Sequence, residues 1–162
     1  MRKYLETEML ADSLKKRISY ICTEYPNTDG CKTIELRVDK ETVKRFSWET
    51  VNSYFIDNGL KSESEHFGKH GYWDGFFELL SKIPMSSRTE YTDEEFCDAL
   101  AQYRNQSIEK SVGSSNPIVR MFALFDRRTG KRTLEKMKEN RGEMPEWLAN
   151  LYNIRLKAEG IA

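Results

Sequence analysis

The segment at residues 116–134, which reads NPIVRMFALFDRRTGKRTL, constrains the fold more than any other part of this chain. Its first half places apolar side chains on nearly every side of a helix, and a helix of this kind is buried in a protein core. Asn116 is a suitable N-cap, and Pro117 suits the first helical position because no N–H is needed there. We therefore predict a central buried helix, whose apolar residues are Ile118, Val119, Met121, Phe122, Leu124 and Phe125.

A dense run of positive charge follows this helix. It comprises Arg127, Arg128, Lys131 and Arg132, here called the basic segment (residues 127–132). Within it, we predict that Gly130 adopts the left-handed conformation that ends many helices. The planar guanidinium of arginine suits bidentate binding of phosphate. The basic segment is therefore a candidate site for a phosphate group or for a partner.

The basic segment also has a structural interpretation, which we favour. Its arginines could pair with the acidic residues at 90–98, with Asp126 and with Glu159, and so hold the helices together. Nucleic acid is the less favoured partner because 26 basic residues balance 26 acidic ones over the whole chain. A nucleic-acid-binding domain usually carries a clear basic excess.

The N-terminal part of the chain contains three runs typical of β-strands. They are residues 17–25, 31–38 and 42–48, rich in β-branched and aromatic side chains. The second run alternates, and the apolar residues on one of its faces are Ile34, Leu36 and Val38. The links at 26–30 and 39–41 are short and made of turn-forming residues. This pattern predicts an antiparallel meander.

Helical patterns precede and follow these strands. The predicted helices cover residues 2–15, Trp48 to Gly59, Trp73 to Pro84, a helix opened by a capping box at Thr92 and Glu95, and a last helix from Pro145. The predicted fold is α+β, with an N-terminal helix and three-stranded antiparallel meander packed against a C-terminal all-helical layer. We expect a single domain over residues 1–162, in which 1–48 form the helix and meander and 49–162 form the helical part.

Aromatic residues gather beside a polar, glycine-containing stretch at residues 61–71. Phe67 and Tyr72 are candidate partner-binding residues, because exposed aromatic side chains often anchor protein interfaces. The neighbouring stripe has helical spacing, and its residues, expected in the core, are Trp73, Phe76 and Phe77.

The sequence offers little for metal or catalytic chemistry. His66 and His70 would share a helical face with Asp74 and Glu78, as metal ligands can. Glycines at 68, 71 and 75 argue against a continuous helix there. We therefore predict no metal site, no cofactor and no catalytic residue, and we lean against an enzyme.

Cysteine usage and hydropathy point to the cytoplasm. Cys22, Cys31 and Cys97 form no C-x-x-C pair and are an odd number, as expected of reduced thiols. No apolar run is long enough for a signal sequence or a membrane span. We expect a soluble cytoplasmic protein that does not bind a membrane.

Several blocks of the chain carry a family resemblance. They are DSLKKR at residues 12–17, VDK at 38–40, NPIVR at 116–120, DRRTGKR at 126–132 and RLKAEGI at 155–161. These blocks resemble an uncharacterised family of small bacterial cytosolic proteins, and residues 49–112 lie outside the resemblance. It implies a stand-alone bacterial domain, and it implies no reaction, ligand or partner.

We therefore expect a non-enzymatic module that binds another protein, through the aromatic region or through oppositely charged helical faces. The alternative is a nucleic-acid or phosphate-ligand binder that uses the basic segment.

Overall fold

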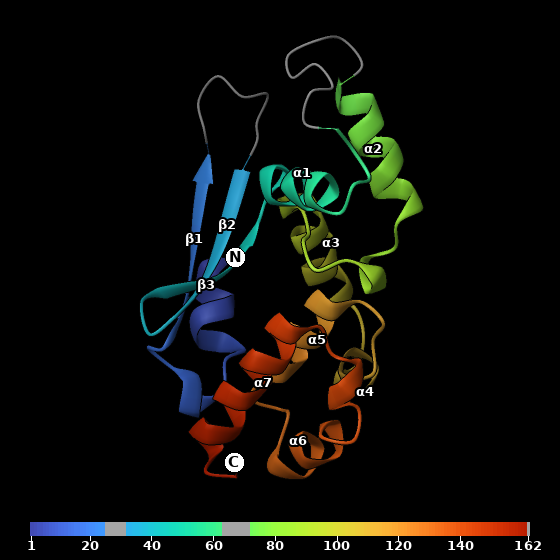
Figure 1. The fold of residues 1–162 in the computed structure, drawn as a ribbon. Helices are drawn as coiled ribbons and strands as arrows, with labels where there is room; N and C mark the ends of the chain where they lie inside the picture. The colour runs from blue at the N-terminus through green and yellow to red at the C-terminus, as the bar shows by residue number, and fades with distance from the viewer. Residues whose placement is uncertain (25–31, 63–71, 162) are drawn as a thin grey trace.

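The computed structural model describes residues 1–24, 32–62 and 72–161, and of Tyr72 it describes the backbone alone (Figure 1). Three strands form one antiparallel sheet in the order β1 (Ile18–Glu24), β2 (Lys32–Val38) and β3 (Glu41–Phe46), so the predicted meander is confirmed. The β2–β3 turn places Asp39 and Lys40 at φ values of 51° and 75°, as in the two-residue turns that fit the twist of a hairpin. The predicted apolar face of β2 is buried.

Helices make up most of the remaining structure. The α-helices are α1 (Trp48–Asp57), α2 (Tyr72–Lys82), α3 (Asp93–Arg104), α4 (Ile108–Val112), α5 (Pro117–Phe125), α6 (Lys131–Met137) and α7 (Glu146–Glu159). Short π-helical or 3-10 turns lie at η1 (Tyr4–Glu8), η2 (Asp12–Leu14), η3 (Met85–Ser87) and η4 (Arg141–Glu143). The meander lies at one side of the helical part (Figure 1), so the α+β prediction is confirmed.

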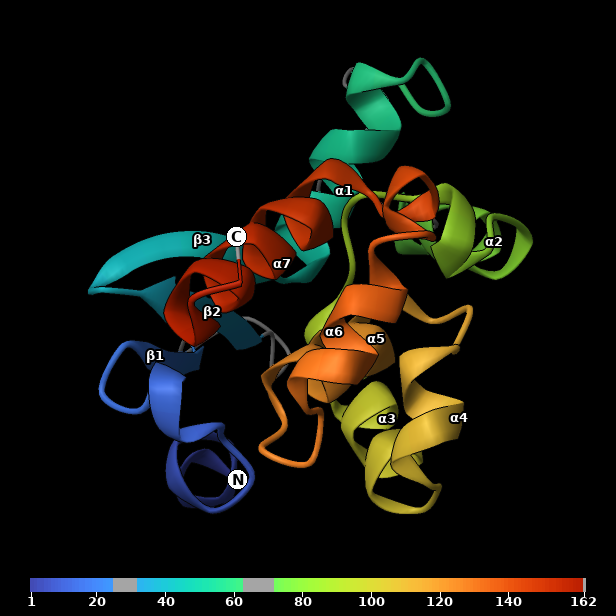
Figure 2. The same ribbon diagram turned by 90° about the horizontal axis from the view of Figure 1, so that it is seen from below.

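The predicted central helix is α5, and α3, α4 and α7 pack around it (Figures 1 and 2). Asn116 caps it, since its Oδ1 accepts from the backbone N–H groups of Ile118 at 3.0 Å and Val119 at 3.4 Å. Every residue of α5 except Arg120 is buried. Phe96 of α3 contacts Phe122 of α5 and also the rings of Tyr20 and Phe46 on the sheet. One continuous core therefore joins the sheet, α3 and α5.

The prediction for Gly130 is wrong. The chain leaves α5 at Asp126, whose backbone is extended, and Gly130 has a φ of −81° as the N-cap of α6. The cause is tertiary: Ala11 N–H donates to the Phe125 carbonyl at 2.9 Å, and Arg127 N–H donates to the Met9 carbonyl at 2.8 Å. This short antiparallel bridge ends the helix without a left-handed residue.

The same bridge divides the predicted opening helix over residues 2–15. Helical structure stops after η1, the chain becomes extended at Leu10 to meet Asp126, and η2 follows. The apolar residues that suggested one helix, Leu5, Met9, Leu10 and Leu14, are nevertheless all buried. Their spacing was set by burial against the core and not by a continuous helix.

Helices α1 and α2 share a separate apolar cluster centred on Val51, Phe55 and Phe76. α2 lies at the upper right of the molecule, outside α1 (Figure 1). Trp73 is half-buried, whereas Phe77 is 41% exposed, so the prediction that Phe77 is a core residue is wrong. The aromatic stripe stabilises a peripheral pair of helices.

Candidate functional site

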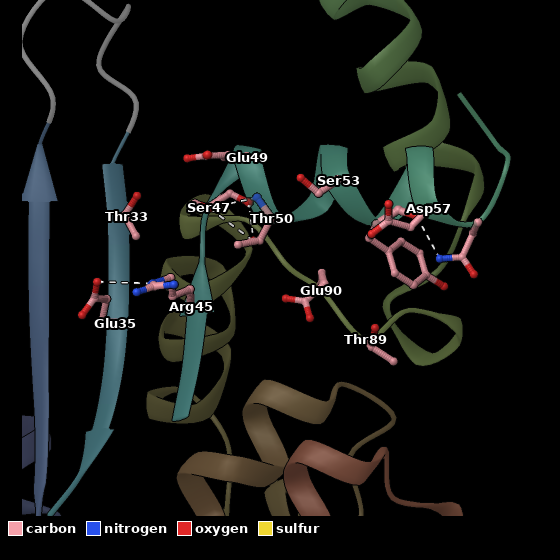
Figure 3. A pocket seen from close by; sticks show the side chains of 12 residues that line it. Thr33, Glu35, Arg45, Ser47, Glu49, Thr50, Ser53, Asp57, Thr89 and Glu90 are labelled. Carbon is pink, nitrogen blue, oxygen red and sulfur yellow. Dashed lines mark hydrogen bonds and ion pairs between the residues drawn. The ribbon is translucent and has the colours of Figure 1, made fainter. Parts of the chain in front are cut away.

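A polar cavity of about 580 Å³ lies between the sheet, α1 and residues 89–90 (Figure 3). Its walls carry hydroxyl groups, amide groups and four carboxylates, which belong to Glu35, Glu49, Asp57 and Glu90. Arg45 of β3 is the cation among the lining residues. Known ligand pockets have volumes in the range of roughly 300–1,000 Å³, so this groove is large enough to hold a ligand.

Local capping places the walls of this groove. β3 ends at Phe46, and Ser47 starts α1 by accepting a hydrogen bond from the Thr50 N–H at 3.1 Å. The backbone N–H of Ser47 donates in turn to the Tyr91 carbonyl at 3.0 Å. Residue 47 therefore fixes both α1 and the 89–91 segment relative to the end of β3.

The negative charge of Glu35 is compensated by cationic and hydroxyl groups on the sheet. It accepts from Arg37 Nη2 at 3.0 Å, from Thr42 Oγ1 at 3.1 Å and from Arg45 Nε at 3.3 Å. The hydrogen bond from Arg37, supported by those from Thr42 and Arg45, holds the pKa of the Glu35 carboxyl below its ordinary value. This side of the groove is an ionised but internally paired surface.

Glu90 is also paired, in this case with a buried lysine. Lys44 Nζ lies 2.7 Å from Glu90 Oε2 and 2.5 Å from the Thr89 carbonyl. Its ammonium also faces the rings of Tyr91 and Trp147 at 5.5 and 5.4 Å. Burial lowers the pKa of Lys44, and the hydrogen bond to Glu90 opposes that effect. These contacts make a stiff wall from residues that are distant in the sequence.

Glu49 and Asp57 differ from the other two carboxylates. Both are exposed side chains of α1 that line the cavity. Within residues 1–24, 32–62 and 72–161, neither has a cation within ion-pair distance. Each of these two carboxylates is therefore available to pair with a positively charged group of a ligand.

A smaller cavity of about 330 Å³ continues the groove along β3. It touches four consecutive residues of the strand, at positions 42–45. Because successive side chains of a strand point to opposite faces, a space that touches all four lies along the strand edge. The two cavities share Arg45, Thr50 and Glu90, so they form one elongated groove.

The basic segment lies elsewhere, and only part of it is paired. Arg128 Nη2 donates to the buried Asp126 at 2.6 Å, as the structural interpretation predicts. Arg127, Lys131 and Arg132 are exposed, and no carboxylate in the described part of the chain lies within ion-pair distance of them. Its role in binding phosphate or a partner stays a prediction.

Three of the acids that the structural interpretation assigned to the basic segment pair with other residues. Glu159 pairs with Arg155 at 3.0 Å, Glu95 pairs with the buried Arg88, and Glu90 pairs with Lys44. Of the predicted contacts, the one between Arg128 and Asp126 is therefore formed.

The aromatic candidates fall largely outside the described ranges. Phe67 lies outside them, as do His66 and His70, and Tyr72 is known as the first residue of α2 without its side chain. The groove residues were missed by the sequence reasoning. The alternation in β2 predicts Glu35 on the face opposite the apolar residues, as observed, but no local pattern brings residues 89–90 beside β3.

Two general features of the described ranges limit the chemistry of the surface. No group of three or more His, Cys, Asp or Glu side chains there has the arrangement of a metal site. None of the helices there has both the length and the apolar composition needed to cross a bilayer. Cys22 and Cys97 are free and exposed thiols.

A family model matches nearly the whole chain. The model of the SF0329 protein family matches residues 1–156 and so includes residues 49–112, which lie outside the sequence resemblance. Neither the curated proteins nor the solved structures contain a match.

Proposed function

Since the chain belongs to the SF0329 protein family, an uncharacterised family with no known activity, we propose from its surface that it is a non-enzymatic protein-interaction module. The site is the elongated groove between β3, α1 and residues 89–90. The observation that carries the proposal is the pair of exposed, uncompensated carboxylates, Glu49 and Asp57, on the wall of an open cavity.

The shape and lining of the groove favour a segment of protein over a compact small molecule. Small-molecule pockets are mostly apolar and enclose their ligand, whereas this groove is polar and follows a strand edge. Its walls are fixed by the Ser47 contacts and by the buried pair of Lys44 and Glu90. A preformed groove loses little conformational entropy when a ligand binds.

Binding of displayed peptides tests this proposal. A library of random peptides of about ten residues is selected for binding to the protein. The affinities of the selected peptides are then measured for the wild-type protein and for the Glu49→Gln/Asp57→Asn double variant. Both residues are exposed, so the double variant should fold normally, and binding should weaken by about tenfold or more. Glu139→Gln, which changes an exposed acid outside the groove, is the matched control. Equal binding by all three proteins would contradict the proposal.

A second candidate function is binding of nucleic acid or of a phosphate-bearing ligand by the basic segment. Its support is that Arg127, Lys131 and Arg132 are exposed and unpaired within the described ranges. Affinity for a short DNA duplex should then fall steeply with added salt. Arginine and lysine side chains that bind the phosphates displace counterions from the DNA, and this release becomes less favourable as the salt concentration rises. An Arg127→Ala/Arg132→Ala variant should flatten that salt dependence, whereas Lys157→Ala should not. A salt-independent affinity would eliminate this candidate.

A further inference from the structure

The outer edge of β3 carries a backbone group that points into the groove. Ser47 N–H donates to the Tyr91 carbonyl, so the backbone of residue 47 faces away from β2. Because backbone direction in a strand repeats every two residues, the N–H and C=O of Arg45 also face away from β2.

The other side of the sheet gives the same result independently. Tyr20 N–H donates to the Glu6 side chain at 2.8 Å and so faces away from β2. Its neighbour Ile21 therefore bonds to its partner Glu35 on β2. Since the backbone of Glu35 faces β1, the backbone of the next residue, Leu36, faces β3 and hydrogen-bonds to Lys44. Arg45 lies opposite Glu35, so its own N–H and C=O face away from β2.

Arg45 lines both cavities, and its backbone faces outward from the sheet beside them. None of the described backbone hydrogen bonds outside the ladder involves Arg45. An unpaired N–H and C=O at a strand edge can template the addition of another strand. The groove therefore offers main-chain partners as well as carboxylates.

The rest of this edge is protected against indiscriminate pairing. The register between β2 and β3 shifts at Leu36 and Arg37, which leaves Val43 as an extra residue in β3. Lys44 is a buried charge directed toward Glu90. Bulges and inward-pointing charges are devices by which sheet edges avoid aggregation. They restrict strand addition to the end of β3 at Arg45, a residue that lines both cavities.

We propose that the partner is an extended basic segment of another protein, which adds to the edge of β3 by pairing with Arg45 and directs separate basic side chains toward Glu49 at the start of α1 and toward Asp57 at its end. This inference rests on the proposed function of the groove. Main-chain hydrogen bonds supply part of the affinity in this mode of recognition, and alternate side chains supply the specificity. The positive charge is argued from the two uncompensated carboxylates.

The test uses two display libraries of random peptides, one with a central lysine and one with a central glutamate. Selected peptides are then resynthesised with a single N-methyl group at each position in turn, which removes one N–H donor and keeps every side chain. Affinities are measured for the full-length protein, the Glu49→Gln/Asp57→Asn variant and the Glu139→Gln control.

We expect binders from the lysine library alone. N-methylation at the residue paired with Arg45 should weaken binding by about tenfold or more, whereas the adjacent position should tolerate it, because its N–H points the other way. The double variant should weaken binding by a similar factor, and the control should not.

Two outcomes would overturn the inference and separate it from the proposed function. The first outcome is binding that depends on the groove but is unaffected by N-methylation, or that comes mainly from the glutamate library. It would support the interaction function and refute an extended basic partner. No groove-dependent binding from either library refutes both.

Discussion

Asp126 is a buried carboxylate whose partners come from different parts of the chain. Tyr103 of α3 donates its hydroxyl to Asp126, and Arg128 donates its guanidinium at 2.6 Å and its backbone N–H at 2.7 Å. The backbone of Asp126 meanwhile bridges to Leu10. One residue thus joins the N-terminal segment, α3 and the start of the basic segment.

Replacing Asp126 should therefore be costly. Asp126→Ala leaves the Tyr103 hydroxyl and part of the Arg128 guanidinium without their acceptor, so we expect the free energy of unfolding to fall by about 3 kcal/mol. Denaturant titration measures this change. Asp98→Ala, at an exposed position of α3, should alter stability by less than about 0.5 kcal/mol. If both variants lost the same free energy of unfolding, the hydrogen bonds of Asp126 would make no measurable contribution to stability.

Glu35 should make stability depend on pH in a defined direction. Its pKa lies below the ordinary value of 4.5, chiefly because Arg37 hydrogen-bonds to the ionised form. The stabilisation is therefore complete above that value and is lost as the pH falls through the lower, folded-state pKa. The loss in unfolding free energy caused by Glu35→Gln should be under about 1 kcal/mol at neutral pH and should shrink in acid.

Urea titrations at about pH 7 and about pH 3 check this prediction. Glu41→Gln serves as the control, because Glu41 is exposed on β3 without an ion pair among the described residues. A loss for Glu35→Gln that grows as the pH falls would contradict the assigned sign.

At the scale of elements, α1 and α2 are expected to open without the rest of the molecule. Phe76 is fully buried, but its cluster is separate from the core around α5. Phe76→Ala should cost about 3–5 kcal/mol of local stability. Amide hydrogen exchange should then accelerate in α1 and α2 while α5 keeps its protection.

Phe122→Ala is the contrasting variant. Phe122 of α5 contacts both Phe96 and Tyr103, so its loss weakens the core that joins sheet and helices. Exchange should accelerate throughout the molecule. If both variants gave the same exchange pattern, α1 and α2 would belong to the same cooperative unit as α5.

These elements show which parts of the fold were predictable. Helix starts followed from local chemistry, and the caps at Asn116 and at Thr92 with Glu95 are formed as predicted. The end of α5 and the break after η1 were not predictable, because both depend on the bridge between Leu10 and Asp126. The groove was missed for the same reason, since residues 89–90 reach β3 through tertiary contacts.

At the scale of the whole molecule, balanced net charge conceals two separate charged surfaces. The acidic groove lies beside α1, and the basic segment leads into α6 at the opposite end of the molecule (Figure 1). The two proposed binding functions therefore use different faces. A groove variant should leave any salt-dependent binding of DNA unchanged, and a basic-segment variant should leave peptide binding unchanged.

The whole chain is predicted to be one domain, and removal of residues 1–48 tests this. The remainder, residues 49–162, would lose Tyr20 and Phe46, which cover Phe96, and the backbone partners of Phe125 and Arg127. Exposure of the apolar faces of α3 and α5 removes burial that stabilises each large side chain by about 1.5–3 kcal/mol. When several such residues are uncovered, the lost stabilisation is comparable to the whole margin of stability of a typical domain, about 5–15 kcal/mol. Residues 49–162 should therefore show helical far-ultraviolet circular dichroism without a cooperative thermal transition, and a sharp transition would instead establish the helical part as a domain of its own.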